Sequence, residues 1–382
     1  MDLRQTEQER LLRRTVREFA EAEIRPHVMD WDEAQGFPAA LVPKLASLGL
    51  LGIQVPDQYG GSGLSAVEYC ICLEELARVD PSVSLSVAAH NGLCAAHLYM
   101  FGSEAQKQTY LIPLAKGETL GAWGLTEASA GSDAAAMRTI ATRTDTGWAI
   151  NGSKQFITHG RIGGTMVVMA VTDRAKGRKG ISAFVLPRGT AGMTAGKKEN
   201  KLGMRASDTS EVIFQDCRLP LDALVGVEGE GFVNTMQVLD AGRIGIAAVA
   251  VGLAQGAYEA ARAYARERRQ FGQPISYFQA IRWKLADMAT RIEAARLMTL
   301  RAAWLRDSRS ADRTSLASSM AKLYSSEIAV RAAEECVQIH GGYGFVKDYP
   351  AEKFFRDVKL CTIGEGTSEI QRLVIARELL GR

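Results

Sequence analysis

The chain has 382 residues and a formal net charge of +3, with 47% hydrophobic and 23% charged residues. This balance excludes extended disorder and collagen-like structure, and the small net charge gives no indication of a nucleic-acid partner. At roughly 100–200 residues per domain, the length predicts two or three domains.

The sequence carries no signal for a membrane span or for export. No apolar run reaches the roughly 18 residues that a membrane span needs, and the charge-free stretch 244–258 is short and rich in Ala and Gly. The N-terminus is charged from Asp2 onward and lacks an apolar signal core. We therefore expect a cytoplasmic protein without a membrane partner.

Cysteine and histidine spacing gives no sign of a metal site. The five histidines are scattered and form no HExxH pattern, so no bound metal is expected. The six cysteines form no CxxC pair, and we expect them to be buried or idle thiols. They are Cys70, Cys72, Cys94, Cys217, Cys336 and Cys361.

Residues 1–120 are predicted to form helices joined by short loops. The turn-rich segment 56–63 separates the early helices from the later ones. A first helix is expected to bury one face, and two further helices are expected over 66–79 and 84–101. The predicted buried face of the first helix holds Leu11, Val16 and Phe19.

Residues 121–230 change to short β-rich runs separated by Gly, Asn and Asp. The pair Asn151-Gly152 between two such runs predicts a hairpin turn. Further strands are expected at 165–172, 181–186 and 210–214. Together these runs predict a small barrel or sandwich.

Residues 231–382 return to a helical period. One apolar stripe is formed by Phe278, Ile281, Leu285, Met288 and Ile292. A seven-residue seam typical of a bundle is formed by Leu316, Leu323, Val330 and Val337. We predict a bundle of about four antiparallel helices, and therefore an α+β chain of three parts: helical, β and helical.

Two motifs in the β part have residue types that suit a flat anionic ligand. The loop LTEASAGSD (residues 125–133) offers small residues and hydroxyls, so that backbone N–H groups can approach an anion. In KQFITHG (residues 154–160), Phe156 and Thr158 project from one face of a strand and suit a flat ring. An ordinary loop and ordinary core packing are the alternatives.

Three further motifs lie in the helical third part. Arg268 in ERRQFG either binds phosphate or complements a helix C-terminus. The glycines of QIHGGYGF follow a helix, and either cap it or let a ligand approach. In GEGTSEIQ, Ser368 and Gln371 have capping-box spacing. Glu365 before them either complements the helix dipole or, if desolvated, is a base.

The joint order of these motifs is more specific than any one of them. Over essentially its whole length the sequence resembles the acyl-CoA dehydrogenase family, and within it the short-chain, butyryl-CoA-type members. The resemblance rests on LTEASAGSD, KQFITHG, GISAFVLP, LDAGRIGIAA, ERRQFGQPI, QIHGGYGF and GEGTSEIQRLVIA. It implies a flavoprotein with FAD as cofactor, a helical N-terminal domain (1–120), a β middle domain (121–230) and a C-terminal four-helix bundle (231–382).

The resemblance also implies two sets of FAD contacts. Within one chain, the flavin ring would be contacted by Leu125, Thr126, Gly131, Ser132, Phe156 and Thr158, and the phosphates by Thr367 and Glu369. The FAD of a neighbouring subunit would be contacted by Arg268, Gln270, Phe271, Gln338, Ile339, His340, Gly341 and Gly342. A homo-oligomer follows, in this family usually a tetramer.

For catalysis, Glu365 matches the family's base, which removes the α-proton of the thioester while the flavin accepts the β-hydrogen as hydride. Some branches place the base elsewhere, at the position that holds Gly242 here. Substrate contacts are implied for Ser132, Asp240, Arg243 and Gly366. Since Gly242 has no side chain, Glu365 is expected to be the only base.

The sequence departs from the family at four positions. Ala128 replaces a usual Pro, and Phe156 and His159 replace a common Trp and Asn. Phe156 keeps the stacking face of an aromatic ring, so flavin binding should survive. Gly364 replaces the aromatic residue that usually precedes the base. Our hypothesis is that Gly364 widens the pocket mouth and admits branched or cyclic acyl groups.

The expected function is FAD-dependent dehydrogenation of a short-chain, branched or cyclic acyl-CoA to trans-2-enoyl-CoA, as in fatty-acid β-oxidation. Electrons are expected to pass to electron-transferring flavoprotein. One alternative is an acyl-CoA oxidase that uses oxygen, although those chains are usually much longer. Another is a non-catalytic flavin-binding protein on the same fold, which would not need Glu365.

Overall fold

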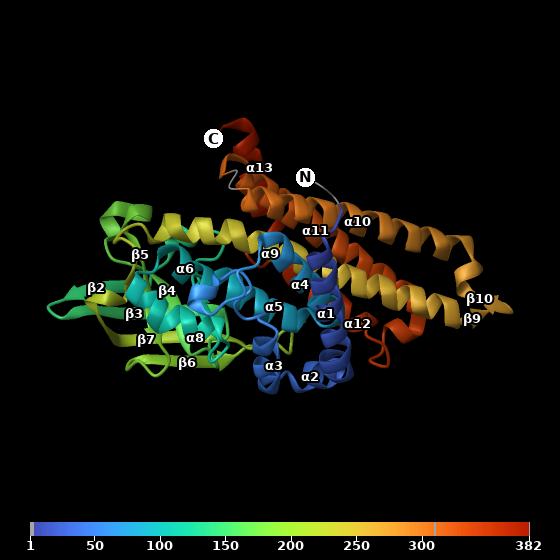
Figure 1. Cartoon of the computed structure of the whole chain (residues 1–382), viewed down its shortest axis with the longest axis horizontal. Helices are drawn as coiled ribbons and strands as arrows, with labels where there is room; N and C mark the ends of the chain where they lie inside the picture. The colour runs from blue at the N-terminus through green and yellow to red at the C-terminus, as the bar shows by residue number, and fades with distance from the viewer. Residues whose placement is uncertain (1–3, 309–310, 382) are drawn as a thin grey trace.

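The computed structural model describes residues 4–308 and 311–381. Figure 1 shows a β sheet at one end of an elongated molecule and long helices that run from it to the other end. The first strand begins at Gly121, and the first long helix after the sheet begins at Gly231. The predicted order of a helical, a β and a second helical part is confirmed.

The N-terminal part consists of short helices. Its α-helices are α1 (Glu7–Phe19), α2 (Val28–Ala34), α3 (Val42–Ser47), α4 (Ala66–Val79), α5 (Pro81–Ala89), α6 (Ala96–Phe101), α7 (Glu104–Gln106) and α8 (Ile112–Ala115). The π-helical segments are η1 (Ala20–Ile24), η5 (His90–Ala95) and η6 (Lys107–Leu111). The chain's 3₁₀ turns are η2 (Arg25–His27), η3 (Ala39–Leu41), η4 (Asp57–Tyr59), η7 (Ala134–Ala136), η8 (Arg174–Gly180), η9 (Leu221–Ala223), η10 (Ile275–Tyr277), η11 (Gly341–Gly344) and η12 (Val358–Thr362).

Local capping explains where two of these helices begin. Ser65 and Glu68 form a capping box that fixes the start of α4, and α4 has the bounds predicted for it. The helix expected from residue 84 begins earlier, at Pro81, because Asp80 accepts a hydrogen bond from the Ser82 N–H. The predicted face of α1 is wrong for Leu11, whose side chain is about half exposed, while Val16 is buried.

The middle part is one eight-stranded mixed sheet in the order β6-β7-β3-β2-β4-β5-β8, with β1 beside β4. A single residue pair joins β2 to β4, and side chains from both halves share one buried cluster. The two halves of this open sheet therefore share one core as in a sandwich, one of the two arrangements predicted. Its strands are β1 (Gly121–Gly124), β2 (Ile140–Thr144), β3 (Gly147–Thr158), β4 (Thr165–Val171), β5 (Ile181–Pro187), β6 (Met193–Lys198), β7 (Thr209–Pro220) and β8 (Leu224–Val225).

The predicted hairpin at Asn151-Gly152 is wrong. These residues lie inside β3, where the register against β7 shifts between Ile150 and Gly152. Gly152 has φ of 142°, and a Cβ there would lie 2.6 Å from the Thr139 hydroxyl oxygen. The glycine thus permits a β-bulge, and the chain reverses earlier, between β2 and β3.

The C-terminal part has three long helices, α9 (Gly231–Glu267), α10 (Gln279–Asp307) and α11 (Ala311–His340). The shorter helices α12 (Ala351–Asp357) and α13 (Ser368–Leu380) complete it, and a hairpin of β9 (Arg269–Gln270) and β10 (Gln273–Pro274) joins α9 to α10. The predicted apolar stripe of α10 packs into the main core, with Met288 and Ile292 buried.

The seven-residue seam predicted for α11 is only half-buried along its length. The fully buried face of this helix consists of small residues, among them Ser318, Ser325, Ala329 and Ala333. The predicted seam is therefore partly buried, with Val330 and Val337 packed against the main core, but it is not the most buried face of the helix. Small side chains let α11 approach the Ala- and Gly-rich helix α9 closely, so leucines are not needed there.

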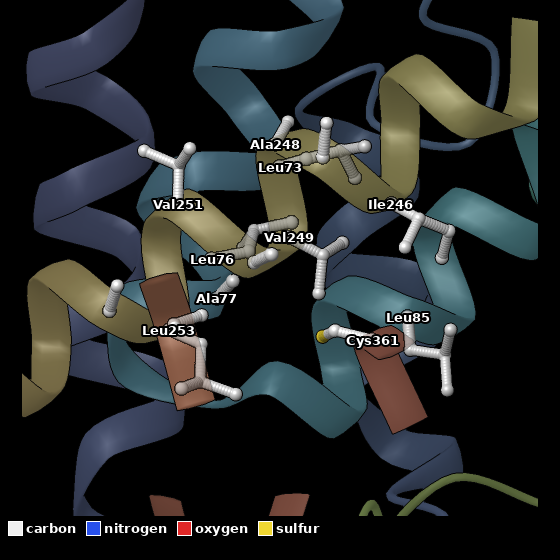
Figure 2. Packing of buried hydrophobic residues seen from close by; sticks show 14 of the residues in the cluster. Leu73, Leu76, Ala77, Leu85, Ile246, Ala248, Val249, Val251, Leu253 and Cys361 are labelled. Carbon is white, nitrogen blue, oxygen red and sulfur yellow. The ribbon is translucent and has the colours of Figure 1, made fainter. Parts of the chain in front are cut away.

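The main core joins the N-terminal and C-terminal parts. Figure 2 shows α4, α5, α9 and η12 meeting through side chains such as Leu73, Leu85, Val249 and Cys361. Helix α9 is long and apolar enough, by length and composition alone, to cross a membrane. Its most apolar stretch is 78% buried inside the protein, as expected of a core helix. All six cysteines are buried, as predicted.

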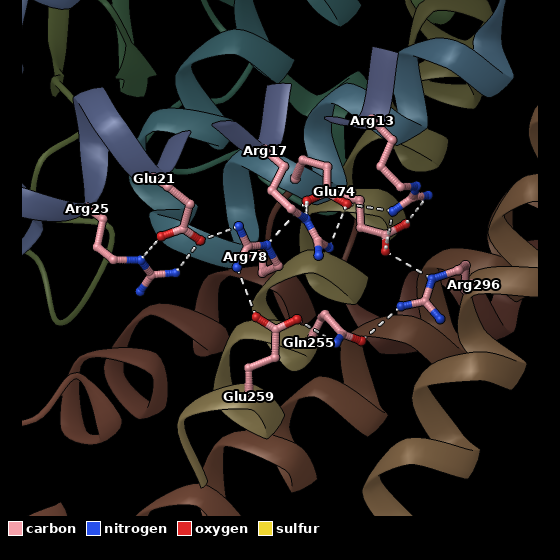
Figure 3. A network of polar contacts seen from close by, with 10 residues as sticks. Arg13, Arg17, Glu21, Arg25, Glu74, Arg78, Gln255, Glu259 and Arg296 are labelled. Atoms are coloured by element: carbon pink, nitrogen blue, oxygen red, sulfur yellow. Dashed lines mark hydrogen bonds and ion pairs between the residues drawn. The ribbon is translucent and has the colours of Figure 1, made fainter. Parts of the chain in front are cut away.

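A polar network fixes α1 against α4, α9 and α10 (Figure 3). Glu75 of α4 is buried and accepts hydrogen bonds from Arg13, Arg17 and Arg78. Arg78 continues the network to Glu259 of α9. Buried carboxylates of this kind need several charged donors to offset their loss of hydration.

Candidate active site

Glu365 lies in the turn between η12 and α13. Its φ is 53°, and Gly366 follows with φ of 95°. Two successive left-handed residues reverse the chain sharply, and for Glu365 this conformation is uncommon. A helix does begin here as predicted, but Thr367 caps it and accepts from the Ile370 N–H at 3.3 Å. The predicted capping role of Ser368 is wrong, because its side chain points into the protein and is buried.

The Glu365 carboxylate faces the protein interior. Its Oε2 atom is buried and has no hydrogen-bond partner among the residues the structure describes. Burial raises the pKa of Glu365 to about 7, although Lys322 and Arg243 act in the opposite direction. A carboxylate with a free oxygen and a pKa near neutrality can serve as a general base.

Glycines of two elements surround this carboxylate. A Cβ on Gly242 of α9 would lie 2.0 Å from Glu365 Oε2, so a larger residue at this position would have to displace the Glu365 carboxylate. Cβ atoms on Gly92 of η5 and Gly245 of α9 would lie 3.0 Å and 2.9 Å from the Tyr69 hydroxyl. The buried Tyr69 hydroxyl therefore packs closely against these two glycines.

Asp240 and Arg243, predicted to line the substrate channel, form an ion pair on α9. Asp240 also accepts from the Ser315 hydroxyl at 3.2 Å, and burial raises its pKa. Arg243 is buried, and its Nε has no partner in the described part of the chain. The pair thus holds a cation close enough to act electrostatically on Glu365.

The predicted ring site lies on the outer face of β3. The register of β3 against β7 shifts between Lys154 and Ile157, and Phe156 takes φ of 60° in this bulge. The Phe156 ring is 62% exposed, and Thr158 is half-buried. The Gln155 N–H donates to the Thr126 carbonyl at 2.8 Å, which sets the loop 125–133 beside the bulge.

That loop presents Leu125 buried, Thr126 half-buried, and Gly131 and Ser132 exposed. A Cβ on Gly131 would meet nothing within 4 Å, so the backbone there is open to a ligand. An exposed aromatic ring next to an open loop with hydroxyls fits a flat ring system such as flavin. The residues present therefore suit the group that the sequence predicts.

A buried ion pair holds the two halves of this site together. The Lys154 ammonium donates to Glu127 Oε1 at 2.8 Å and to the Leu125 carbonyl at 3.1 Å. Glu127 also accepts from the N–H groups of Arg138 and Thr139. Lys154 is 0% exposed, and burial lowers its pKa to about 8. The loop and the bulge are thus fixed by one ammonium group.

Eight predicted cofactor residues lie elsewhere. Gln270 belongs to the β9–β10 hairpin, at the end of the molecule opposite the sheet (Figure 1), and is flanked by Arg268 and by the 92% exposed Phe271. At the end of α11, Ile339 and His340 are buried, whereas Gln338, Gly341 and Gly342 are exposed. One chain therefore does not bring these residues to its own ring site.

The remaining predicted residues flank Glu365. Thr367 is half-buried, Glu369 is exposed on the first turn of α13, and Gly366 follows the base directly. Sequence reasoning missed Lys154, Glu127, Tyr69, Lys322 and Gln371. Two of these had a signal: Lys154 occupies an inward position of a strand, and Lys322 is a lone cation on a face of small residues.

Comparison with known proteins places the whole chain in one group. Family models of acyl-CoA dehydrogenase match residues 6–118 (N-terminal domain), 122–217 (middle domain) and 229–380 (C-terminal domain). The short-chain specific acyl-CoA dehydrogenase of Clostridium acetobutylicum is 45% identical over 379 residues, which cover 99% of this chain and 100% of that protein.

Two solved structures share the fold over the full length of both chains. Butyryl-CoA dehydrogenase from Megasphaera elsdenii is 42% identical with a TM-score of 0.97, and 100% of each chain is covered. A chain in a structure of the electron transferring flavoprotein of Acidaminococcus fermentans is 45% identical with a TM-score of 0.98, again with 100% of each chain covered.

Proposed function

The chain belongs to the acyl-CoA dehydrogenase family, and from this membership we propose that it oxidises a short acyl-CoA thioester to trans-2-enoyl-CoA. FAD is the cofactor, and electron-transferring flavoprotein is the electron acceptor. The observation that carries the proposal is the buried Oε2 of Glu365, which lies against Gly242 and has no hydrogen-bond partner among the described residues.

In this reaction Glu365 removes the α-proton of the thioester through Oε2. Its pKa of about 7 lets it be ionised before the transfer and hold the proton afterwards. When bound, FAD supplies the redox chemistry by accepting the β-hydrogen as hydride. Phe156, Thr158 and the loop 125–133 orient the ring, and Arg243 keeps a positive charge near the base.

The space beside the base supports a short acyl chain. Gly92, Gly242 and Gly245 bring η5 and α9 close together, and Tyr69 ends the space between them. At the mouth, a Cβ on Gly364 would make only ordinary contacts with Leu360, the nearest at 3.5 Å. In our proposal the acyl chain ends near Tyr69, and Gly364, which has room for a Cβ, admits a branched group beside the base.

Replacing Gly364 by Tyr should narrow this entrance. We expect kcat/KM for isobutyryl-CoA to fall about tenfold or more and that for butyryl-CoA to change less than threefold, because crowding a packed site costs about 1–3 kcal/mol. Steady-state rates of both proteins with both thioesters test this. The unmodified enzyme is also tested with branched and cyclic acyl-CoAs. If its rates with them are negligible compared with its rate with butyryl-CoA, the hypothesis that Gly364 widens the pocket mouth is wrong.

Replacing Lys154 by Met should weaken FAD binding. This change leaves Glu127 buried without its cation, and removing one partner of a buried ion pair lowers stability by about 3–5 kcal/mol. We expect part of this loss to appear as disorder of the loop 125–133, which contacts the flavin in our proposal. We expect the dissociation constant of FAD to rise at least about tenfold, measured by flavin fluorescence. Lys176→Met, which removes an exposed partner of Asp173, is the control and should bind FAD normally. Equal affinity in all three proteins would exclude this role for Lys154.

The electron acceptor separates this function from its rival, an acyl-CoA oxidase. Purified enzyme with butyryl-CoA should reduce electron-transferring flavoprotein and release little hydrogen peroxide in air. Peroxide formed in proportion to enoyl-CoA would identify an oxidase instead. If the FAD-loaded protein reduces neither electron-transferring flavoprotein nor oxygen with any acyl-CoA tested, the result would favour a non-catalytic flavin-binding protein.

We propose further that the chain assembles as a homotetramer and that it acts in fatty-acid β-oxidation in the cytoplasm. The support is the distance between the β9–β10 hairpin and the sheet (Figure 1), together with the exposed Phe271 and Tyr343. A second copy would carry Arg268, Gln270 and Phe271 to the FAD of the first. The mass in solution by light scattering tests this, and a monomer that binds FAD fully would contradict it.

A further inference from the structure

The turn that carries the base is held by two buried side chains, Lys322 and Gln371. The Gly366 carbonyl accepts from the Lys322 ammonium at 2.7 Å and from the Gln371 amide at 2.9 Å. The same Gln371 amide lies 3.2 Å from the Glu365 carbonyl. Because both residues of this turn are left-handed, its carbonyls point away from regular helix partners and depend on these donors.

Lys322 is an unusual donor for a purely structural bond. It projects from α11, is 0% exposed, and is surrounded on its own helix by small residues such as Ser318 and Ser326. The Gly366 carbonyl is its one hydrogen-bond partner in the described part of the chain, and no described carboxylate lies within 4 Å of its ammonium. A buried ammonium without a paired carboxylate is costly, and a neutral donor would satisfy the carbonyl at lower cost.

We propose that Lys322 is a positioning residue for Glu365: its ammonium fixes the 365–366 turn through the Gly366 carbonyl and stabilises the negative charge of the base before proton transfer. This proposal rests on the proposed function only for the statement that Glu365 is the base. The contacts of Lys322 and the charge of Glu365 can be measured in the resting protein.

The charged and titratable groups around the base come from five elements. Lys322 of α11 and Arg243 of α9 act on Glu365 itself, and Glu365 in turn raises the pKa of the buried Tyr69 hydroxyl of α4. Cys361 of η12 and Glu369 of α13 act on Lys322. Arg243 is already paired with Asp240, whereas no described carboxylate lies within 4 Å of the Lys322 ammonium. Burial lowers the pKa of Lys322 to about 8, so it remains mostly protonated at neutral pH.

The direction of the effect follows from these charges. Burial raises the pKa of Glu365 to about 7, and Lys322 opposes this rise. Without the ammonium, the pKa of Glu365 should rise further, by about one unit, as expected for loss of a nearby opposite charge. The base is active when ionised, so the acid limb of the pH profile should move to higher pH by the same amount.

The test compares Lys322→Met with Gln371→Met. Both variants remove one donor to the Gly366 carbonyl, but only the first removes a charge. For Lys322→Met we expect the acid limb of kcat with butyryl-CoA to move up by about one pH unit, which lowers kcat about tenfold at pH 6, with KM changed less than threefold. For Gln371→Met we expect a lower kcat at all pH values and an unmoved acid limb. Lys322→Arg should restore the limb to within about 0.3 units.

A second readout does not need turnover. Infrared difference spectra, assigned with Glu365→Gln, follow the protonation of the Glu365 carboxyl in resting enzyme, and its midpoint should rise in Lys322→Met. An unchanged midpoint and an unmoved acid limb in Lys322→Met overturn the proposal. If Lys322→Met does not fold, the same result in Lys322→Gln decides. A wild-type enzyme that oxidises no acyl-CoA would overturn the proposed function, while the infrared midpoint still decides on Lys322.

Discussion

Glu365→Gln should reduce kcat by about 10⁴-fold while FAD stays bound. Glutamine has nearly the same shape but cannot accept the α-proton, and removal of a general base commonly costs about 10²–10⁴-fold. We expect the upper end of this range because Gly242 leaves no other carboxylate at the alternative position. The loss should fall on kcat and not on folding, since Oε2 has no hydrogen bond to lose among the described residues.

Steady-state reduction of electron-transferring flavoprotein by butyryl-CoA measures this loss, with the flavin spectrum as a check on cofactor content. Glu334→Gln is a matched control, because it neutralises an exposed carboxylate of α11 that pairs with Arg331 at 2.7 Å. Its kcat should stay within twofold of the unmodified enzyme. A Glu365→Gln enzyme with more than about a tenth of the normal kcat would mean that another group removes the α-proton.

Lys353→Met should give the largest loss of stability. Lys353 of α12 donates to Asp80 at 2.9 Å and to Asp357 at 2.6 Å, and none of the three side chains is more than 2% exposed. Asp357 also accepts from the Met204 N–H at 2.6 Å, so the cluster joins the middle part of the chain to α12. Without the ammonium, two buried carboxylates would lack a cation, which costs about 3–5 kcal/mol.

Chemical or thermal unfolding followed by circular dichroism measures this change. Lys347→Met is the control, since it removes the same charge from an exposed pair with Glu33 on the surface and should leave the unfolding midpoint nearly unchanged. If both variants unfold at the same midpoint, the buried cluster does not contribute to the stability of the fold. Recovery in Lys353→Arg would indicate that the charge matters more than the shape of the side chain.

Elements with strong local signals were predicted well from the sequence. Helix α4 has its predicted bounds because the capping box of Ser65 and Glu68 and the apolar period agree locally. The hairpin at Asn151-Gly152 was wrong because the same dipeptide also suits a β-bulge, and only the register against β7 distinguishes the two. The seam of α11 is only partly buried because small residues, which carry little apolar signal, form the most buried face of this helix.

The site shows the same division. Glu365, Phe156 and Thr158 were predicted from motifs that are contiguous in the chain. The groups that hold them were not, because Lys322 and Gly366 are separated by 44 positions, and Lys154 and Glu127 by 27. Contacts between residues so far apart in the sequence follow from packing, and no local sequence pattern predicts them. The space that Glu365 Oε2 occupies likewise depends on Gly242, which belongs to helix α9.

The most direct test of the account is an anaerobic titration of the flavin-loaded protein with short acyl-CoAs, followed in the visible spectrum. We expect butyryl-CoA to bleach the flavin bands of the unmodified protein and to leave those of Glu365→Gln unchanged. Bound flavin that no short, branched or cyclic acyl-CoA bleaches would contradict it. A protein that takes up no flavin after reconstitution would exclude a working dehydrogenase.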